Sequence, residues 1–369
     1  MSSRSIRKVI GFIPQRLIRR VLIAATTFVA LSASLWAQTE LGPVTVGAGL
    51  QTGFAHTEPK GSTSTDQLTL NSVRLYVNGT ASKNIKFMFN TEYDGATNKV
   101  GVLDAVARIE VSPQFNIWAG RFLPPSDRAN LYGPYYAHHW NVYTDGIQDG
   151  YPFVATGRDN GVVYWGDFAK KLKVSAGGFD GATATGNKNV IGAARVQYDF
   201  WDPEGGYYLN GTYYGGKNLL AIGAAVQAQS ALVPGQPVNK ATSADFLLER
   251  KLPDSSVVTV EAEFANYDRL GGYSPNYTSD KGGYGLVSYL FPKPVGPGKF
   301  EVLGKYAQAR FSRGVTTANV PFNQKTTEFN FNYVIKDFNA RVMSFYQRSN
   351  FTATSPNTWR IGVGLQIQM

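Results

Sequence analysis

The last eleven residues of the chain alternate strictly between apolar side chains and polar or small ones. The apolar positions are Trp359, Ile361, Val363, Leu365, Ile367 and Met369. A period of two places all of them on one face of a β-strand. The same period recurs upstream, for example over Ile85–Tyr93, Leu103–Val111, Val258–Phe264 and Phe329–Ile335. Such a chain folds either as a soluble sandwich or as a barrel whose apolar face contacts lipid.

The connections between these segments favour the barrel, because short and long ones alternate. Short connections are predicted at Ser82–Asn84, Ser112–Gln114, Asp167–Lys171, Leu252–Ser255, Pro292–Gly298 and Asp337–Phe338. Long ones are predicted at His56–Asp66, Leu123–Thr156, Asp180–Asn189, Ser230–Asn239, Asn266–Lys281, Ser312–Lys325 and Ser349–Asn357. Short turns on one side and long loops on the other are typical of membrane barrels. Such a sheet must close on itself, because lipid offers no hydrogen-bond partner to the backbone N–H and C=O groups at an open sheet edge. We therefore predict an all-β fold, a transmembrane antiparallel β-barrel of about 16 strands.

One region is ambiguous in this count. Gly206–Tyr214 has the pattern of a strand, but counting it gives an odd total and inverts every later connection. We therefore interpret Trp201–Asn218 as one connection on the short-turn side, with the next strand at Leu219–Gln229. Tyr and Trp near strand ends, including Tyr76, Trp165, Tyr198 and Tyr306, suit the aromatic girdles of such barrels.

The N-terminal segment has the layout of an export signal. Residues 1–37 contain six basic residues and no acidic one, followed within the segment by the apolar run Val21–Ala33, and Ala37 suits a cleavage site. This predicts a secretory signal peptide at 1–37 and an exported barrel at 38–369. The alternative is a single anchor helix, for which the run is short, since a membrane helix needs about 20 apolar residues.

The net charge of +10, from 36 basic and 26 acidic residues, comes mainly from that segment. Without its six basic residues the excess falls to +4, and the remaining charges form no basic stripe, which excludes a nucleic-acid partner. The chain has no cysteine, so it has neither a disulfide framework nor a thiolate metal site. We predict no cofactor.

Short motifs between Arg74 and Asn218 resemble the phosphate-selective porin O/P family. They are Arg-Leu-Tyr-Val-Asn-Gly-Thr at 74–80, Gly-Arg-Phe-Leu-Pro-Pro at 120–125, Gly-Arg-Asp-Asn-Gly-Val-Val-Tyr at 157–164, Gly-Gly-Phe-Asp-Gly at 177–181 and Gly-Thr-Tyr-Tyr-Gly-Gly-Lys-Asn at 211–218. The resemblance implies a sixteen-stranded, homotrimeric outer-membrane porin.

Alternation assigns one set of charged side chains to the lumen. The basic members are Arg74, Lys86, Arg108, Lys173, Arg195, Lys305 and Arg360. The acidic members are Glu92, Asp94, Asp104, Glu110, Glu261, Glu263, Glu301 and Glu328. Because charges that line a pore set its selectivity, this balance predicts a weakly selective conduit. The alternative is that they are solvated residues on a wet face.

The longest connection, Leu123–Thr156, follows the fifth predicted strand, where the loop of sixteen-stranded porins folds inward and narrows the pore. The candidate constriction residues are Asp127, Arg128, Tyr135, His138, His139, Asp145 and Asp149. The loop is net acidic, which argues against a phosphate-specific path, and two adjacent histidines without a further ligand predict no metal site. The alternative is a loop on the outer surface.

We therefore predict a passive porin of the bacterial outer membrane. It would sit in outer-membrane lipid and pass small hydrophilic solutes or inorganic ions, anions such as phosphate included. The alternatives are a structural or adhesion barrel and a barrel enzyme of the lipase or protease kind. The chain has three histidines and no Gly-x-Ser-x-Gly motif, so we predict no enzymatic activity.

Overall fold

The computed structural model describes residues 43–147, 157–181, 190–230, 239–268, 277–313, 322–352 and 356–369. The predicted signal peptide at 1–37 lies outside these residues and stays a prediction. None of the helices in the described ranges is long and apolar enough to cross a membrane.

The described chain forms sixteen strands, as the alternation predicts. They are β1 (Val44–Pro59), β2 (Thr65–Ser82), β3 (Ile85–Asp94), β4 (Lys99–Ser112), β5 (Phe115–Phe122), β6 (Asp159–Phe168), β7 (Leu172–Phe179), β8 (Ile191–Asp199), β9 (Leu219–Gln229), β10 (Asn239–Lys251), β11 (Val257–Asp268), β12 (Tyr277–Leu290), β13 (Lys299–Arg313), β14 (Phe322–Lys336), β15 (Ala340–Phe351) and β16 (Thr358–Gln368). Each strand pairs antiparallel with its neighbours in sequence.

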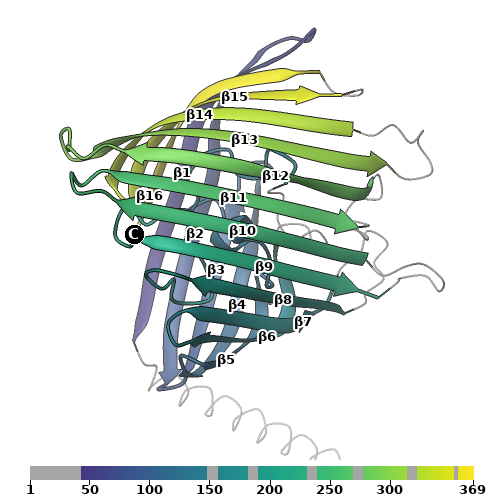
Figure 1. The fold of residues 1–369 in the computed structure, drawn as a ribbon, viewed down its shortest axis with the longest axis vertical. Coiled ribbons are helices and arrows are strands. Elements are labelled where there is room, and N and C mark those ends of the chain that lie inside the picture. The colour runs from purple at the N-terminus through teal and green to yellow at the C-terminus, as the bar shows by residue number, and fades with distance from the viewer. Residues whose placement is uncertain are drawn as a thin grey trace, which may run out of the picture.

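The barrel closes between its first and last strands. β1 pairs with β16 from Gly49 opposite Gln368 to Pro59 opposite Thr358, so the sheet has no free edge. The predicted alternating strand at the C-terminus is therefore the closing strand (Figure 1). Closure gives hydrogen-bond partners to the backbone N–H and C=O groups that an open edge would leave unpaired in lipid.

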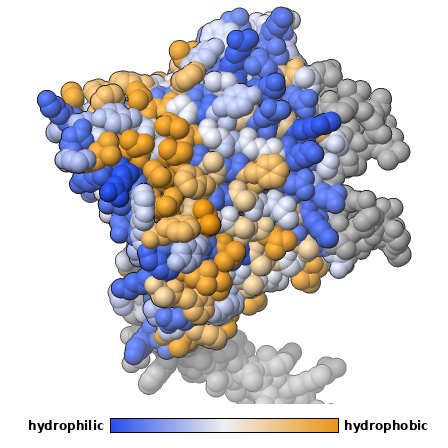
Figure 2. All heavy atoms as spheres, in the orientation of Figure 1, coloured by the Kyte–Doolittle hydropathy of each residue, from blue (hydrophilic) through white to orange (hydrophobic). Residues whose placement is uncertain are grey.

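The two faces of the wall differ as a period of two requires. On β11, Glu261 and Glu263 are buried in the interior, whereas Phe264 is 55% exposed on the outside. Phe329 and Val287 are exposed in the same way on β14 and β12. Figure 2 shows hydrophobic side chains gathered over the outer wall, with hydrophilic ones toward the end that carries the long loops. An apolar outer band of this kind is the surface that a lipid bilayer requires.

The predicted connections are confirmed in position, with one correction to a length. Trp201–Asn218 forms no strand and β9 begins at Leu219, so the interpretation of this region as a connection is correct. β1 continues to Pro59 and β2 begins at Thr65, which makes the first long-side connection much shorter than His56–Asp66. The side chains of that predicted loop still pair across the strands, His56 Nδ1 lying 2.7 Å from Asp66 Oδ1. β1 and β2 thus remain paired beyond the part of the wall that carries the apolar band.

The predicted aromatic girdle is partly wrong. Tyr198 and Tyr306 are exposed on the outer face, but Trp165 is buried inside the barrel. Its ring packs edge-on against Trp118 at 5.9 Å between centroids, and Tyr76 also faces the interior. The nearness of an aromatic residue to a strand end does not by itself show whether its ring faces the outside or the lumen of the barrel.

Candidate functional site

The connection after β5 enters the barrel lumen as a short helix, α2 (Arg128–Tyr132), all of whose residues are buried. Asp127 caps the helix, its Oδ1 accepting from the Asn130 N–H at 2.7 Å. Gly133 ends it with φ +62°, a left-handed conformation that favours glycine, and donates its N–H to the Ala129 carbonyl at 3.1 Å. Contacts within the loop itself therefore cap both ends of α2.

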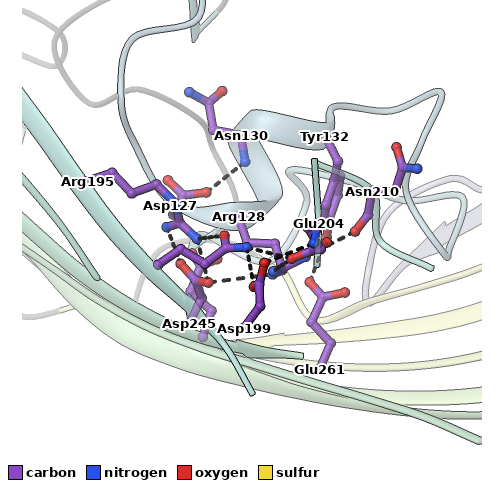
Figure 3. Close-up of polar contacts among 12 residues, drawn as sticks. Asp127, Arg128, Asn130, Tyr132, Arg195, Asp199, Glu204, Asn210, Asp245 and Glu261 are labelled. Atoms are coloured by element: carbon purple, nitrogen blue, oxygen red, sulfur yellow. Dashed lines mark hydrogen bonds and ion pairs between the residues drawn. The ribbon is translucent and has the colours of Figure 1, made fainter. Parts of the chain in front are cut away.

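A buried ion pair joins α2 to the connection between β8 and β9. Arg128 Nη1 and Nη2 donate to the two carboxylate oxygens of Glu204 at 3.0 and 2.5 Å, and both side chains are fully buried (Figure 3). Gln197 Nε2 and the Tyr213 hydroxyl also donate to Glu204, at 2.8 and 3.0 Å. Burial alone would raise the pKa of Glu204, but the charge of Arg128 and its hydrogen bonds hold this pKa below the ordinary value.

A second ion pair holds the start of the loop against the wall. Arg195 on β8 donates through Nη1 and Nη2 to the Asp245 carboxylate on β10 at 2.5 and 2.8 Å. Arg195 Nη1 also donates to the Ser126 carbonyl at 3.1 Å, and Arg128 Nε lies 3.5 Å from Asp245 Oδ1. Two buried guanidinium groups thus share one carboxylate of the wall, and the loop is fixed to it through both (Figure 3).

Asp127 lies beside this cluster and is itself buried. Burial raises the pKa of its carboxyl to about 7, the nearby Asp245 charge adding to the rise, while the Asn130 N–H opposes it. The cap of α2 is therefore a carboxyl whose charge changes near neutral pH.

The rest of the loop contacts other parts of the wall. His138 Nε2 lies 2.6 Å from Glu301 Oε1 on β13, and this carboxylate, outweighing the effect of burial, raises the pKa of His138. Lys305, also on β13, lies 2.6 Å from Asp145 and 3.0 Å from His139 Nε2. The two histidines therefore serve different contacts, and the described residues contain no group of three potential metal ligands.

Strands on the opposite side of the barrel hold the same loop. Arg341 on β15 donates to the carbonyls of Ala137 at 2.6 Å and Tyr135 at 3.1 Å. The Tyr135 hydroxyl lies 3.1 Å from Ser72 Oγ, and the Arg74 guanidinium lies over the Tyr135 ring at 4.4 Å. Contacts to β2, β13 and β15 show that this segment crosses the lumen. Asp149, predicted for the same loop, lies outside the described residues.

The connection between β8 and β9 also enters the lumen, which the sequence reasoning missed. Tyr207 and Leu209 are buried, and the Tyr207 hydroxyl donates to the Leu123 carbonyl at 2.8 Å. The Gly211 N–H donates to the Tyr136 carbonyl at 2.8 Å. Glu249 on β10 accepts from Thr212 Oγ1 and from two backbone N–H groups of the connection. Two inserts, one from each end of the barrel, therefore pack against each other inside it.

The predicted wall residues fall into separate groups. Lys86 and Arg108 both approach Glu110, at 2.7 and 3.8 Å, beside Trp118. Arg360 stands apart from them, with its guanidinium 5.7 Å from the Phe345 ring. Lys173 is buried on β7.

Glu261 and Glu263, on one face of β11, both lie within hydrogen-bond distance of tyrosine hydroxyls. Glu261 Oε1 accepts from the hydroxyls of Tyr132, at 2.9 Å, and Tyr284, at 2.5 Å. The Tyr284 hydroxyl also lies 3.4 Å from Glu263 Oε2. Glu261 thus holds α2 through Tyr132, which is a structural contact.

The two inserts leave a cavity of about 580 Å³ against the inner wall of β1–β4. Its charged lining residues are Arg74, Asp104 and Arg158. Arg74 Nε donates to Glu92 Oε1 at 2.8 Å, and Arg158 Nε donates to Asp104 Oδ1 at 3.1 Å. The remaining lining residues are polar, aromatic or apolar: Thr45, Val46, Gly47, Tyr76, Asn78, Met88, Asn90, Leu123, Leu131, Tyr132, Tyr136, Tyr208, Leu209, Asn210 and Met369.

Arg158 and Glu204 are the charged residues of this arrangement that strand alternation could not identify. Arg158 directly precedes β6, and Glu204 lies in a connection, so neither has a strand face. The only sequence signal for Glu204 was the length of Trp201–Asn218, which is long for a turn on the short side.

No protein-family model and no curated protein matches this chain. Membership of the phosphate-selective porin O/P family therefore stays a prediction. Solved structures do match. OmpF of Salmonella typhi in complex with daunomycin is 13% identical, with a TM-score of 0.59, over 88% of this chain and 97% of that one.

Two further solved structures match over a similar share of both chains. An anion-selective porin from Comamonas acidovorans is 14% identical, with a TM-score of 0.54, over 89% of this chain and 99% of that one. A loop-deletion mutant of OmpT, an outer-membrane protein of Vibrio cholerae, is 14% identical, with a TM-score of 0.56, over 89% of this chain and all of the other. At these identities the shared property is the fold, which is that of a sixteen-stranded outer-membrane β-barrel.

Proposed function

We propose that this chain is a porin, a passive channel for small hydrophilic solutes and ions across the bacterial outer membrane. The observation that carries the proposal is the lumen itself. Charged and polar side chains line a closed barrel, and two inserts pack inside it beside a cavity with a mixed-charge wall. A barrel of sixteen strands is wide enough for an aqueous path, and loops that enter it set the size of that path.

Weak ion selectivity is part of the proposal. The arginines that line the cavity are each hydrogen-bonded to a carboxylate, Arg74 to Glu92 and Arg158 to Asp104. Because each positive charge is balanced by a negative one within hydrogen-bond distance, the field along the path favours neither sign strongly. A phosphate-specific path would need basic residues without such partners. We therefore place phosphate among the conducted anions and not as the dedicated substrate.

The same reasoning supports a channel over a barrel enzyme. Glu261 and Glu263 are hydrogen-bonded to tyrosines, and His138 is bound to Glu301. The contacts of Glu261 and His138 hold the loop, and none of these contacts places an activated nucleophile against an open cavity.

We also propose a homotrimer that is exported through its N-terminal segment. OmpT of Vibrio cholerae was solved in a trimer form, and it shares this fold at 12% identity with a TM-score of 0.54, over 88% of this chain and 99% of that one. The basic and apolar character of residues 1–37 supports export. Crosslinking of the protein folded in detergent, followed by a denaturing gel, tests the trimer.

Planar-bilayer recording tests the function. The folded protein should give discrete conductance steps and a small reversal potential in a tenfold KCl gradient, far below the ideal value of about 59 mV for one charge. A potential close to that limit for chloride would contradict weak selectivity and favour an anion pathway. Absence of conductance from correctly folded protein would contradict the porin proposal itself.

A further inference from the structure

The outer wall of β12–β15 carries a row of basic side chains near the long-loop end of the barrel. The row consists of Lys281 on β12, Arg310 on β13, Lys325 on β14 and Arg348 on β15. All four side chains are exposed, and each lies three or four residues from the strand end that leads into a long loop. Figures 1 and 2 show hydrophilic side chains over this end of the wall, beyond the hydrophobic band. We call these four residues the basic row.

The strand register brings the basic row together. Lys281 lies directly opposite Arg310 in the pairing of β12 with β13. Lys325 and Arg348 follow as diagonal neighbours across the next two strand pairs. Side chains directly opposite each other are about 5 Å apart, and diagonal neighbours are about 7–8 Å apart. Two adjacent members of the row can therefore contact the same phosphate group.

Acidic side chains of the same strands do not neutralise the basic row. Asp280, Glu301 and Glu328 on β12, β13 and β14 are each 1% exposed and lie inside the barrel. β15 contains no acidic residue. Within the described parts of the chain, none of the four basic residues takes part in an ion pair. The row is therefore a positive surface that an external anion can approach without displacing a carboxylate.

A groove of about 360 Å³ lies at the β12 end of the row, on the outer face of β11–β13. Its lining residues are Lys281, Arg310, Asn266, Ser279, Ser312 and Asp268. The ammonium and guanidinium groups donate hydrogen bonds, as the amide and hydroxyl groups also can, and phosphate oxygens accept them. Asp268 is the acid of the groove, and it lies opposite Lys240 on β10, which supplies a charge of the opposite sign. The groove therefore has the donor set of a phosphate site.

The wall beside the basic row is apolar on the side of the short turns. Tyr306 lies four positions from Arg310 along β13, and Phe329 lies four positions from Lys325 along β14. These two aromatic side chains are 49% and 58% exposed. At about 3.4 Å per residue, four positions correspond to about 13 Å along a strand. A lipid whose acyl chains contact these rings therefore has its headgroup at the level of the basic row.

We propose that the basic row and its groove bind the phosphate groups of a phosphorylated lipid in the leaflet on the long-loop side. Lys281 and Arg310 hold one phosphate between them, and Asn266 and Ser279 donate hydrogen bonds to it. The other two members of the row extend the positive surface along the wall, and the acyl chains pack on the apolar band. Basic side chains beside a membrane surface attract anionic headgroups in this way. The site lies outside the barrel, so it goes beyond the proposed channel and does not depend on conduction.

Lipid A, whose disaccharide headgroup carries phosphate groups, is the probe. The comparison lipid is the same molecule after removal of its phosphates. Native mass spectrometry of the detergent-folded protein counts the lipid molecules that each protein retains. The parent protein should retain the phosphorylated lipid and lose most of the dephosphorylated one. Excess inorganic phosphate should not displace the lipid, because it cannot replace the contacts of the acyl chains.

Two substitutions in the groove test the site. Lys281→Gln and Arg310→Gln should each weaken retention of the phosphorylated lipid roughly fivefold, and the double variant roughly twenty-five-fold. The matched control is Lys336→Gln, which removes a charge from an exposed lysine at the opposite end of β14. Retention by this control should equal that of the parent protein.

Three results would overturn the lipid site. Equal retention of the two lipids by the parent protein would show that phosphate is not recognised. Unchanged retention in the double variant would place the lipid elsewhere on the wall. Displacement by inorganic phosphate would indicate a site for free anions.

Single-channel conductance separates this inference from the porin proposal. Lys281 and Arg310 lie on the outer face, so the double variant should conduct like the parent protein. Conductance without lipid retention in the parent overturns the lipid site and leaves the channel standing. Lipid retention without conductance supports the lipid site and contradicts the channel.

Discussion

Replacing Glu204 by Gln tests whether the two inserts hold each other inside the barrel. Glu204 and Arg128 are fully buried, and the guanidinium donates to both carboxylate oxygens. Glutamine has the same shape and keeps one acceptor, but it removes the negative charge. Glu204→Gln therefore leaves a buried guanidinium without its main counter-charge.

The expected cost follows from this geometry. Removing one partner of a buried ion pair costs about 3–5 kcal/mol. Arg128 keeps a weaker contact with Asp245 at 3.5 Å, so we take the lower end, about 3 kcal/mol. At about 1.4 kcal/mol per factor of ten, the population in which the inserts have separated rises roughly a hundredfold. The sixteen strand pairings do not involve this contact, so the barrel itself should persist.

Single-channel recording measures this population as the fraction of time spent at high conductance. The variant should show frequent large openings, whereas the matched control Glu58→Gln, in which the carboxylate is exposed, should behave like the parent protein. Heat-modifiable migration on a detergent gel should be the same for all three proteins.

The pH dependence gives an independent check. The pKa of Glu204 is lowered in the folded protein, so its contribution to docking is present above its ordinary pKa and is lost as the pH falls through the lowered value. The parent protein should therefore show an opening step in strong acid, and Glu204→Gln should not show that step. A variant with the conductance and the acid response of the parent would refute the role of this ion pair.

Three further outcomes are expected. The pKa of Asp127 is raised to about 7, so its contribution to docking is fully present below its ordinary pKa and is lost as the pH rises from there through about 7; Asp127→Asn keeps the helix cap and should abolish the change in conductance between about pH 4 and pH 7. Excision of residues 127–150 should raise single-channel conductance while the barrel stays folded, and an unchanged conductance would mean that the path is narrowed elsewhere. Phe329→Arg places a charge on the outer face, where Phe329 is 58% exposed, and should lower the stability of the barrel in urea titrations in liposomes by about 2–4 kcal/mol; an unchanged titration would contradict the lipid-facing assignment.

Much of the barrel could be predicted from the sequence, because lipid imposes a pattern on it. Each strand must present an apolar side chain at every second position, as Trp359–Met369 does, and each backbone group must be paired within the sheet. Parity then decided that Trp201–Asn218 is a connection, since an odd strand would have inverted everything after it. The alternation can be read within a single strand, and the parity follows from the number of strands. Neither requires knowledge of contacts between distant residues.

The arrangement inside the barrel was decided only by the tertiary structure. Alternation states that Arg195 faces inward, but not that it meets Asp245 and the carbonyl of Ser126. The ion pair between Arg128 and Glu204 joins two connections, where no period applies, across 76 positions of sequence. The alternation along a strand indicates on which side of the wall a residue lies. The partner of that residue depends on how the two inserts fill the lumen. The arrangement of the inserts is determined by packing and by ion pairs between residues far apart in the chain.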